Sequence, residues 1–290
     1  MTPEQRLELW DWPYRAHSQF IEIDGLRWHL QRCGQGPCLL LLHGTGAANH
    51  SWCGVMPSLA QHYDVIAPDL PGHGLSAVPP HQSLSLPGMA QALSCLLARL
   101  EVKPLWVAGH SAGAAILAEM CLTRHIKPRA LISINGAMLA LPGFTGAMFA
   151  SSARALAAMP GVAGWVASLG RKRRFTAAML ESTGSQVSED MLKRYRCLTG
   201  YAPHIAAAVQ MMAQWDLKTL EQRLPLLELP VHLICCDNDK TVRPEQATTL
   251  SKLVPDSHLH ELAGLGHLGH EEDPERILRV LGGVLGRSLI

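Results

Sequence analysis

The segment Gly109-His110-Ser111-Ala112-Gly113 constrains this chain more than any other part of its sequence. It follows a short apolar run, 104–108, and precedes a stretch of small residues, 112–124, that we expect to be helical. The order strand, sharp turn, helix holds a serine in a strained backbone conformation with its hydroxyl exposed above a sheet. Glycines flank such a serine because a Cβ atom on either side would crowd the turn. The alternative is a glycine-rich connection between a strand and a helix whose serine has no catalytic role. The rest of the sequence decides between a catalytic and a purely structural serine.

Two further segments supply an acid and a histidine in the chain order that a serine hydrolase of the α/β type requires. The apolar run 231–236 predicts a buried strand and is followed by Asp239. The run 257–262 predicts another strand and leads into a loop that contains His267. Loop residues that follow parallel strands meet at one edge of a sheet. The sequence therefore predicts a catalytic triad of Ser111, Asp239 and His267.

The acid of the triad has a competitor two residues away. Asp239 is followed by Val242 and Pro244, a spacing that is usual after this strand in such folds. We expect Asp237 to cap the turn through its side chain instead. Asn135 follows the predicted strand 130–134, at the place where some proteins of this kind carry the acid, so that position offers none.

The histidine of the triad also has a competitor. His267 follows a glycine in a loop, whereas His270 adjoins the acidic run 271–273. We expect His267 to be the catalytic base and His270 to be a cap or a surface residue.

A glycine-rich loop upstream predicts an oxyanion hole. The apolar strand 38–42 ends at His43-Gly44-Thr45-Gly46-Ala47, where the backbone can approach a substrate closely. Acyl transfer needs N–H donors aimed at the developing oxyanion. We expect these donors to be the backbone N–H groups of Thr45 and Ala112, although a plain strand-to-helix loop would have a similar composition.

The composition agrees with a cytoplasmic enzyme and gives no sign of a cofactor. The chain has 290 residues, 48% of them hydrophobic, and a net charge of +1, which does not favour nucleic-acid binding. Its eight cysteines and fifteen histidines show no metal-ligand or disulfide spacing, so we expect no metal. The N-terminus lacks the features of a signal peptide, and no apolar run reaches the roughly 18 residues of a membrane span.

Residues 136–203 interrupt the alternation of strands and helices. We expect them to form a helical lid inserted into a core made of residues 1–135 and 204–290. The lid is basic, because no Asp or Glu occurs between Glu119 and Glu181 while the run 171–174 is Arg-Lys-Arg-Arg. Such a lid suits a substrate with carboxylates or an anionic membrane surface. The alternative is a solvated helix end stabilised by the helix dipole.

A substrate pocket is expected beside the serine. Gly44 and His110 adjoin the predicted oxyanion hole, and a predicted helix over 205–220 carries Met211, Met212 and Trp215. Methionine adapts to a flat ring and tryptophan can stack on it. Met211 and Trp215 would equally suit a hydrophobic core.

These motifs resemble the α/β-hydrolase superfamily across nearly the whole chain. More narrowly, the chain resembles the BchO-type magnesium-chelatase accessory proteins of bacteriochlorophyll biosynthesis. The segments that carry the resemblance are 25–29, 39–47, 50–52, 67–74, 86–90, 109–115, 135–137, 183–185, 211–217 and 266–272.

The resemblance implies an α/β-hydrolase fold, with a mostly parallel central sheet and an inserted helical lid. It also implies a role in making magnesium-containing tetrapyrroles, with magnesium-chelatase subunits as candidate partners. Three functions follow as expectations: hydrolysis of an ester or thioester, tetrapyrrole binding without catalysis, and interaction with the chelatase. A general carboxylesterase is a further alternative, and a basic lid would allow peripheral contact with the inner membrane.

Overall fold

A computed structural model describes residues 2–78, 84–140 and 143–290, and within 143–150 it describes the backbone only. Among these residues eight strands form one sheet in the order β1-β2-β4-β3-β5-β6-β7-β8. The β1–β2 and β2–β4 pairs are antiparallel, and the other neighbouring pairs are parallel. The strands are β1 (Ser18–Ile23), β2 (Leu26–Cys33), β3 (Cys38–Leu42), β4 (Asp64–Pro68), β5 (Trp106–His110), β6 (Leu131–Ile134), β7 (Val231–Cys236) and β8 (Ser257–Leu262).

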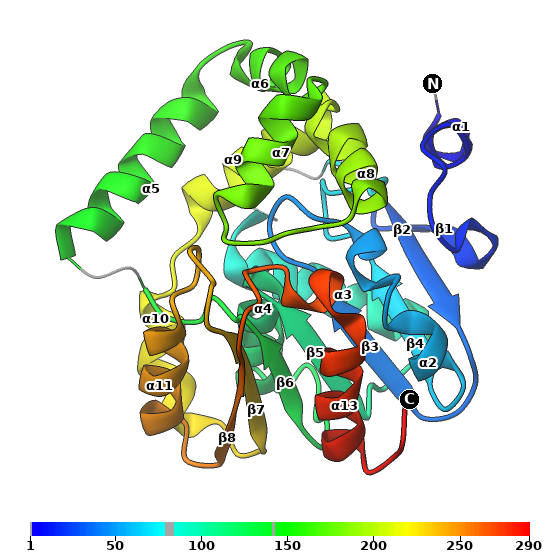
Figure 1. The fold of residues 1–290 in the computed structure, drawn as a ribbon, viewed down its shortest axis with the longest axis vertical. Coiled ribbons are helices and arrows are strands. Elements are labelled where there is room, and N and C mark those ends of the chain that lie inside the picture. Colours follow the sequence, from blue (N-terminus) through cyan, green and yellow to red (C-terminus); the bar gives the residue numbers. More distant parts are fainter. Residues whose placement is uncertain (1, 79–83, 141–142) are drawn as a thin grey trace.

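Helices cover both faces of the sheet (Figure 1). Those of the core are α1 (Pro3–Leu9), α2 (Met56–Ala60), α3 (Leu86–Arg99), α4 (Ala112–Leu122), α10 (Lys218–Arg223), α11 (Pro244–Leu253), α12 (Gly269–Glu272) and α13 (Pro274–Leu285). Short 3₁₀ turns occur at η1 (Arg15–His17), η2 (Asn49–Trp52) and η4 (Leu224–Leu226). The mostly parallel sheet with helices on both faces is the predicted fold class.

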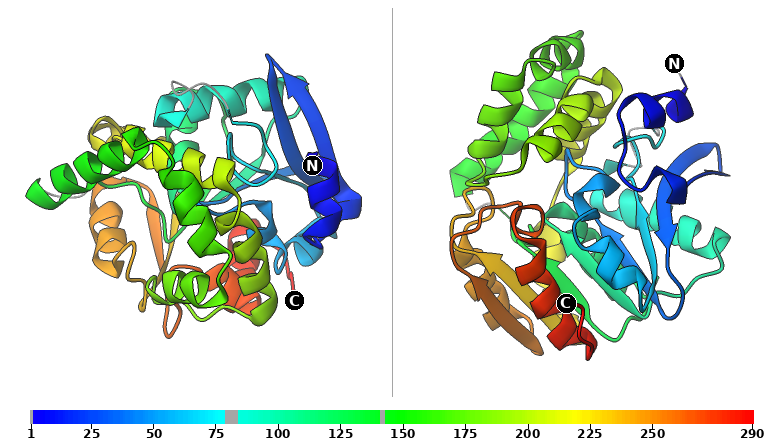
Figure 2. Two further views of the ribbon diagram at one scale, coloured as in Figure 1. Left: turned by 90° about the horizontal axis from the view of Figure 1, so that it is seen from above. Right: turned by 45° about the vertical axis from the view of Figure 1, so that its right-hand side comes forward.

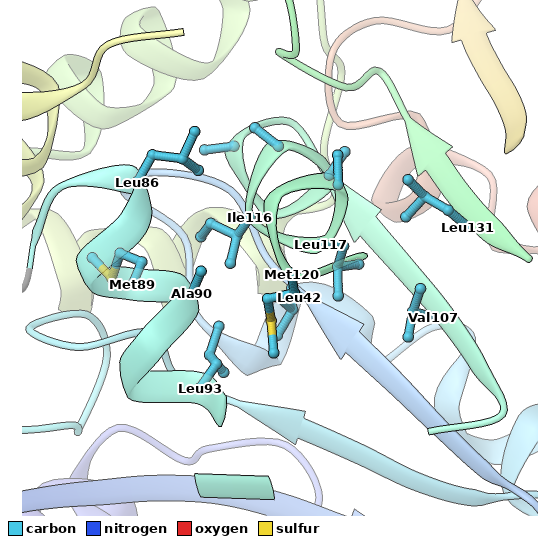
Figure 3. Packing of buried hydrophobic residues seen from close by; sticks show 14 of the residues in the cluster. Leu42, Leu86, Met89, Ala90, Leu93, Val107, Ile116, Leu117, Met120 and Leu131 are labelled. Atoms are coloured by element: carbon cyan, nitrogen blue, oxygen red, sulfur yellow. The ribbon is translucent and has the colours of Figure 1, made fainter. Parts of the chain in front are cut away.

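The central strands divide the hydrophobic core into two layers. In β3, Leu40 and Leu42 join the cluster under α3 and α4, whereas Leu39 and Leu41 join the cluster under α2 and α13. Figure 3 shows the first layer, with Leu42 close to side chains of α3 and α4. A strand that is apolar at every position is expected where helices cover both faces of a parallel sheet. The central strands are therefore held between two apolar layers.

A second group of helices stands together above the sheet in Figure 1: α5 (Gly143–Ala158), α6 (Val162–Gly170), α7 (Arg173–Glu181), α8 (Glu189–Thr199) and α9 (Ala202–Gln214). The chain enters this group after β6 and returns through α9, which packs against α5, α6 and α8. Residues 141–142 of the expected lid lie outside the described residues. The division into a lid, 136–203, and a two-part core remains a proposal.

The single helix expected over 205–220 is wrong. Helix α9 ends at Gln214, Trp215 is extended with φ −80° and ψ 110°, and α10 begins at Lys218. The Asp216 carboxylate accepts a hydrogen bond from the Lys218 N–H at 2.9 Å. This local bond offers the backbone an alternative to continuing the helix.

The N-terminal hairpin, β1–β2, turns at Asp24 and Gly25. Asp24 and Gly25 both have positive φ, 49° and 75°, as a two-residue turn of the hairpin type requires. Figure 2 shows α1 beside this hairpin in both views, and Arg27 of β2 is hydrogen-bonded to Glu4 of α1. The first helix is therefore joined to the edge of the sheet.

The packing around α4 leads to a test of stability. A Cβ atom on Gly113 would lie 2.3 Å from the Leu42 carbonyl oxygen, so Gly113→Ala forces β3 and α4 apart. We expect a loss of about 1–3 kcal/mol, measured by urea denaturation. The matched control is Gly283→Ala on α13, where a Cβ meets no atom within 4 Å and should stabilise the helix by about 0.5–1 kcal/mol. Equal effects at both sites would contradict this account of α4.

Candidate active site

Ser111 occupies the turn between β5 and α4 with φ +52° and ψ −119°. A non-glycine residue in this region of backbone space is strained and persists only where its surroundings hold it. The Ser111 N–H donates to the Ile134 carbonyl at 3.0 Å, and its own carbonyl accepts from the Ala137 N–H at 3.0 Å. Ile134 is the last residue of β6 and Ala137 lies three residues beyond it, so the neighbouring strand and the loop after it hold the serine in place.

The glycines around Ser111 are required by close contacts. A Cβ on Gly109 would lie 2.5 Å from the Ala114 nitrogen. A Cβ on Gly44 would lie 2.9 Å from the Ser111 Cβ and 3.0 Å from His110 Nδ1. The predicted oxyanion loop therefore passes directly beside the predicted nucleophile.

Asp239 and His267 are brought together as the sequence predicts. His267 Nδ1 lies 2.7 Å from Asp239 Oδ2, and both side chains are buried. The other carboxylate oxygen of Asp239 accepts from the N–H groups of Thr241, at 2.7 Å, and Val242, at 2.9 Å. These donors orient the carboxylate toward the imidazole.

Asp237 lies elsewhere. Its carboxylate accepts from the Gly264 N–H at 2.6 Å and its side chain is exposed. It joins the ends of β7 and β8, which is a structural role of the kind expected for it.

Asn135 is a positioning residue. From the sequence we expected only that this position supplies no acid for the triad. Its amide nitrogen donates to the carbonyls of Gly266, at 3.1 Å, and His267, at 2.9 Å. Its amide oxygen accepts from the Cys236 N–H at 2.9 Å. Asn135 has a φ of 45°, and asparagine tolerates this left-handed conformation better than most residues. An asparagine at a strand end is the signal that could have identified it.

His110 supports the same loop. Its Nε2 donates to the His267 carbonyl at 2.9 Å, and the two rings lie 4.6 Å apart between centroids. Burial and the neighbouring His270 and His267 hold the pKa of His110 well below its usual value, so this ring is neutral. The residue before Ser111 is therefore bonded to the backbone of His267.

The predicted oxyanion loop is held from two sides. His43 donates from Nδ1 to the Gly44 carbonyl at 2.8 Å and accepts from the Leu70 N–H at 2.9 Å. His204 of α9 bonds to the Gly46 carbonyl at 3.1 Å. Ala112 is the first residue of α4, so its N–H has no partner within the helix.

The remaining predicted pocket residues lie on or after α9. Met211 is fully buried in the core under α4, and its sulfur lies 3.5 Å from the Thr45 hydroxyl. Trp215 is partly buried against the same core, and Met212 is partly buried. Met211 and Trp215 thus have the packing that the core interpretation expects, and a substrate role for them remains a proposal.

The expectation that His270 is a cap or surface residue is wrong. It is fully buried, its Nε2 lies 2.8 Å from the Ser51 hydroxyl, and its ring lies 4.9 Å from that of Trp52. Burial lowers the pKa of His270 to about 3. The reason is that α12 packs against η2, so the residue next to an acidic run points inward.

Glu271 connects α8 to the core beneath it. Its carboxylate accepts from the Tyr195 hydroxyl at 2.8 Å and also from Ser51. Burial raises the pKa of Glu271 to about 7, although these two hydrogen bonds act in the opposite direction. A buried carboxylate with two neutral donors therefore titrates near neutral pH.

The basic run 171–174 is exposed. Arg171 caps the C-terminal end of α6, where a cation is favourable, whereas Arg173 and Arg174 begin α7, where it is not. Arg173 forms a two-bond pair with Glu189, at 3.1 and 2.7 Å. The helix dipole thus explains Arg171 but not the whole run.

The described residues contain neither a cluster of metal-ligating side chains nor a helix that could span a membrane. Outside residues 1, 79–83 and 141–142, no three His, Cys, Asp or Glu side chains are grouped for a metal ion. Within the same part of the chain, no helix is both long enough and apolar enough to cross a membrane.

Known proteins resemble this chain in sequence and in structure. The model of the Alpha/beta hydrolase family matches residues 39–280. A magnesium-chelatase 30 kDa subunit of Rhodobacter capsulatus is 36% identical over 263 residues, covering 90% of this chain and 92% of that protein. A pimeloyl-acyl-carrier-protein methyl ester esterase of Aeromonas hydrophila is 25% identical over 267 residues, covering 89% and 98%. An α/β hydrolase fold protein from Burkholderia ambifaria has a TM-score of 0.77 at 25% identity, covering 93% and 97%.

The raised pKa of Glu271 leads to a test of stability against pH. Because its folded pKa of about 7 exceeds the ordinary value of 4.5, unfolding releases a proton between these two pH values. The stability that Glu271 contributes is therefore present below pH 4.5 and is lost as the pH rises to about 7. We expect the Tm of Glu271→Gln, relative to the unchanged protein, to increase by several degrees between about pH 5 and 8.

Thermal denaturation followed by circular dichroism measures this difference. Glu228→Gln, at an exposed carboxylate, is the control and should show no such trend. A constant difference for Glu271→Gln across the range would contradict the assignment.

Proposed function

The chain belongs to the α/β hydrolase family, and on that basis we propose that it is a serine hydrolase acting on an ester or thioester. The observation that carries the proposal is the buried 2.7 Å contact between Asp239 and His267 Nδ1. In the proposed mechanism the His267 Nδ1–H donates to Asp239, and Nε2 is then the general base. Ser111 is the proposed nucleophile because β5 and α4 hold it in the strained conformation described above.

In the proposed reaction, the Ser111 oxygen forms a bond to the substrate carbonyl carbon while His267 Nε2 takes the hydroxyl proton. His267 then gives that proton to the leaving alcohol or thiol as the ester bond breaks. Water, deprotonated by the same imidazole, then attacks the acyl carbon, and the imidazolium returns this proton to the Ser111 oxygen as the acyl–serine bond breaks and the acid leaves. Asp239 stabilises the imidazolium formed in each half of the reaction.

We assign the oxyanion hole to the N–H groups of Thr45 and Ala112. The Ala112 N–H is unpaired within α4, and the helix adds the positive end of its dipole. The bonds from His43 and His204 fix the loop before substrate arrives, so the donors need little reorganisation in the transition state.

We further propose a role beside magnesium chelatase, in which the substrate is an ester of a tetrapyrrole. The support is the similarity to the magnesium-chelatase 30 kDa subunit of Rhodobacter capsulatus. The alternatives are a protein that binds a tetrapyrrole or a chelatase subunit without catalysis, and a general carboxylesterase. An intact Asp239–His267 contact favours retained chemistry, because a binding protein would not need it.

The triad is tested by labelling with a fluorophosphonate probe and by hydrolysis of p-nitrophenyl esters. We expect Ser111→Ala to abolish labelling and Asp239→Asn to lower kcat by about 10⁴-fold, because the imidazole loses its orientation. Asp237→Asn is the matched control, since its carboxylate bonds only a backbone N–H at the β8 end, and should change kcat by less than about tenfold.

Two outcomes would reject this assignment. One is ester turnover that survives Ser111→Ala at the original rate. The other is a reversal in which Asp237→Asn is the more damaging change. Absence of labelling and turnover in the unchanged, folded protein would favour the binding alternatives.

The outer surface of the lid supports a proposed contact with anionic membranes. Leu156, Met159 and Trp165 are 44%, 56% and 63% exposed, and the basic run 171–174 follows on the next helix. Exposed indole and apolar side chains in the same segment as a run of cations are typical of proteins that bind a lipid interface.

Cosedimentation with vesicles tests the contact. We expect binding to vesicles rich in phosphatidylglycerol, little binding to phosphatidylcholine alone, and at least a fivefold loss in Trp165→Ser combined with Arg174→Gln. Arg124→Gln, an exposed arginine before β6, is the control. Equal binding to both vesicle types, or no loss in the double variant, would contradict the proposal.

A further inference from the structure

A hollow of about 400 Å³ opens between α1 and the helices above the sheet. Its walls come from four places in the chain: α1, the end of α6, the end of α8 and the start of α9. No member of the proposed triad or of the oxyanion loop lines it. The lining residues are Arg6, Trp10, Arg171, Arg196, Cys197, Gly200, Tyr201, Ala202 and Pro203.

The charge of this hollow is of one sign. Arg6, Arg171 and Arg196 line it and no acidic residue does. Within the described part of the chain, none of these three guanidinium groups takes part in an ion pair. The Nε of Arg196 is buried and has no hydrogen-bond partner there. Unpaired cations around one cavity form a site that favours an anion.

The walls also carry aromatic rings. Trp10 and Tyr201 meet edge to face with centroids 5.6 Å apart, and the Arg6 guanidinium lies 4.2 Å from the centre of the Tyr201 ring. Both aromatic side chains are only partly buried. An aromatic surface beside guanidinium groups suits a ligand that has a flat ring as well as negative charge.

The start of α9 adds a third favourable element. Tyr201 is the N-cap of this helix, which runs from Ala202 to Gln214, and its side chain makes no capping bond. The first turn of a helix carries unpaired N–H groups and the positive end of the dipole. Ala202, at this end, belongs to the wall of the hollow and carries such an N–H, whereas its neighbour Pro203 has none.

Helix capping explains only part of this arrangement. Arg171 and Arg196 lie at the C-terminal ends of α6 and α8, where a cation is stabilising, and Arg196 donates to the Arg171 carbonyl at 3.3 Å. Arg6 lies in the last turn of α1, where a cation is likewise stabilising, and it lines the same hollow. The dipoles of three separate helices do not account for the meeting of their cations around one open volume.

We infer that this hollow binds an organic anion with a flat aromatic ring and two or more carboxylate or phosphate groups. The three guanidinium groups bind the oxyanions and Trp10 supports the ring. The inference does not rest on the proposed hydrolase activity. Because Pro203 precedes His204, which holds the Gly46 carbonyl, a bound ligand would lie one residue from a support of the oxyanion loop.

Titration calorimetry with the full-length Ser111→Ala protein tests the site. The probes are ATP, which joins a ring to phosphates, protoporphyrin IX, which joins a ring to carboxylates, and pyrophosphate, which has no ring. We expect ATP or protoporphyrin IX to bind saturably, more tightly than pyrophosphate, and more weakly as salt is added. Binding of one of the two ring compounds would identify phosphate or carboxylate as the preferred anion.

Variants separate the site from its surroundings. Arg6→Gln and Arg196→Gln should each lower the affinity for the preferred probe by about tenfold, because each removes charge-assisted hydrogen bonds. Arg279→Gln, an exposed arginine on α13 outside the hollow, is the matched control and should leave the affinity within twofold. If Arg196→Gln does not fold, Arg6→Gln on the short first helix carries the test.

Three results would overturn the inference. The first is no saturable binding of either ring compound at millimolar concentration. The second is an affinity that Arg6→Gln and Arg196→Gln leave unchanged, with only the Tm of the latter reduced, which would leave helix capping as the whole role. The third is pyrophosphate binding as tightly as the ring compounds, which would remove the aromatic part of the proposed ligand.

Discussion

The left-handed backbone of Ser111 is the constraint on which the rest of the site depends. Its N–H is bonded to the end of β6 and its carbonyl to the loop that follows this strand, so the serine is placed by β6 and the residues directly after it. The same strand end carries Asn135, which bonds the loop of His267 and the end of β7. One corner of the sheet therefore positions the serine, the histidine loop and the strand that precedes the acid. Burial of β5 and β6 on both faces is what makes that corner rigid.

Much of this could be predicted from the sequence, because the signals are local. Apolar runs predict the central strands. The small residues around Ser111 predict the turn, because a Cβ atom at Gly109 or Gly113 would collide with backbone atoms. The spacing to Val242 and Pro244 favoured Asp239 over Asp237, and Asp239 is the one whose carboxylate contacts His267, whereas Asp237 accepts from Gly264. Helix ends were less predictable. Helix α9 stops before Trp215, where the Asp216 side chain accepts a hydrogen bond from the Lys218 N–H, and hydrophobic periodicity does not reveal such a bond.

Features made by distant segments could not be read in this way. His270 follows a loop and precedes acidic residues, and only the packing of α12 on η2 makes it a core residue. Glu271 titrates near neutral pH because α8 covers it with Tyr195, 76 positions away in the chain. The hollow beside α1 joins residues 6 and 201, whose separation in the sequence gives no hint that they meet.

The bonds that hold α8 and α9 also limit how a substrate can enter. Tyr195 ties α8 to Glu271, and His204 ties α9 to Gly46 and to the Gly74 N–H, at 3.0 Å. Swinging these two helices away would expose a buried carboxylate and release the proposed oxyanion loop. Helix α7 is fixed as well, because the carbonyl of Thr183, just beyond it, accepts from the N–H groups of Lys240, at 3.0 Å, and His267, at 3.4 Å. Among the described residues, no hydrogen bond joins α5 or α6 to these loops. Any gate that opens without breaking these bonds must therefore be formed by α5 and α6, while α7, α8 and α9 act as its fixed frame.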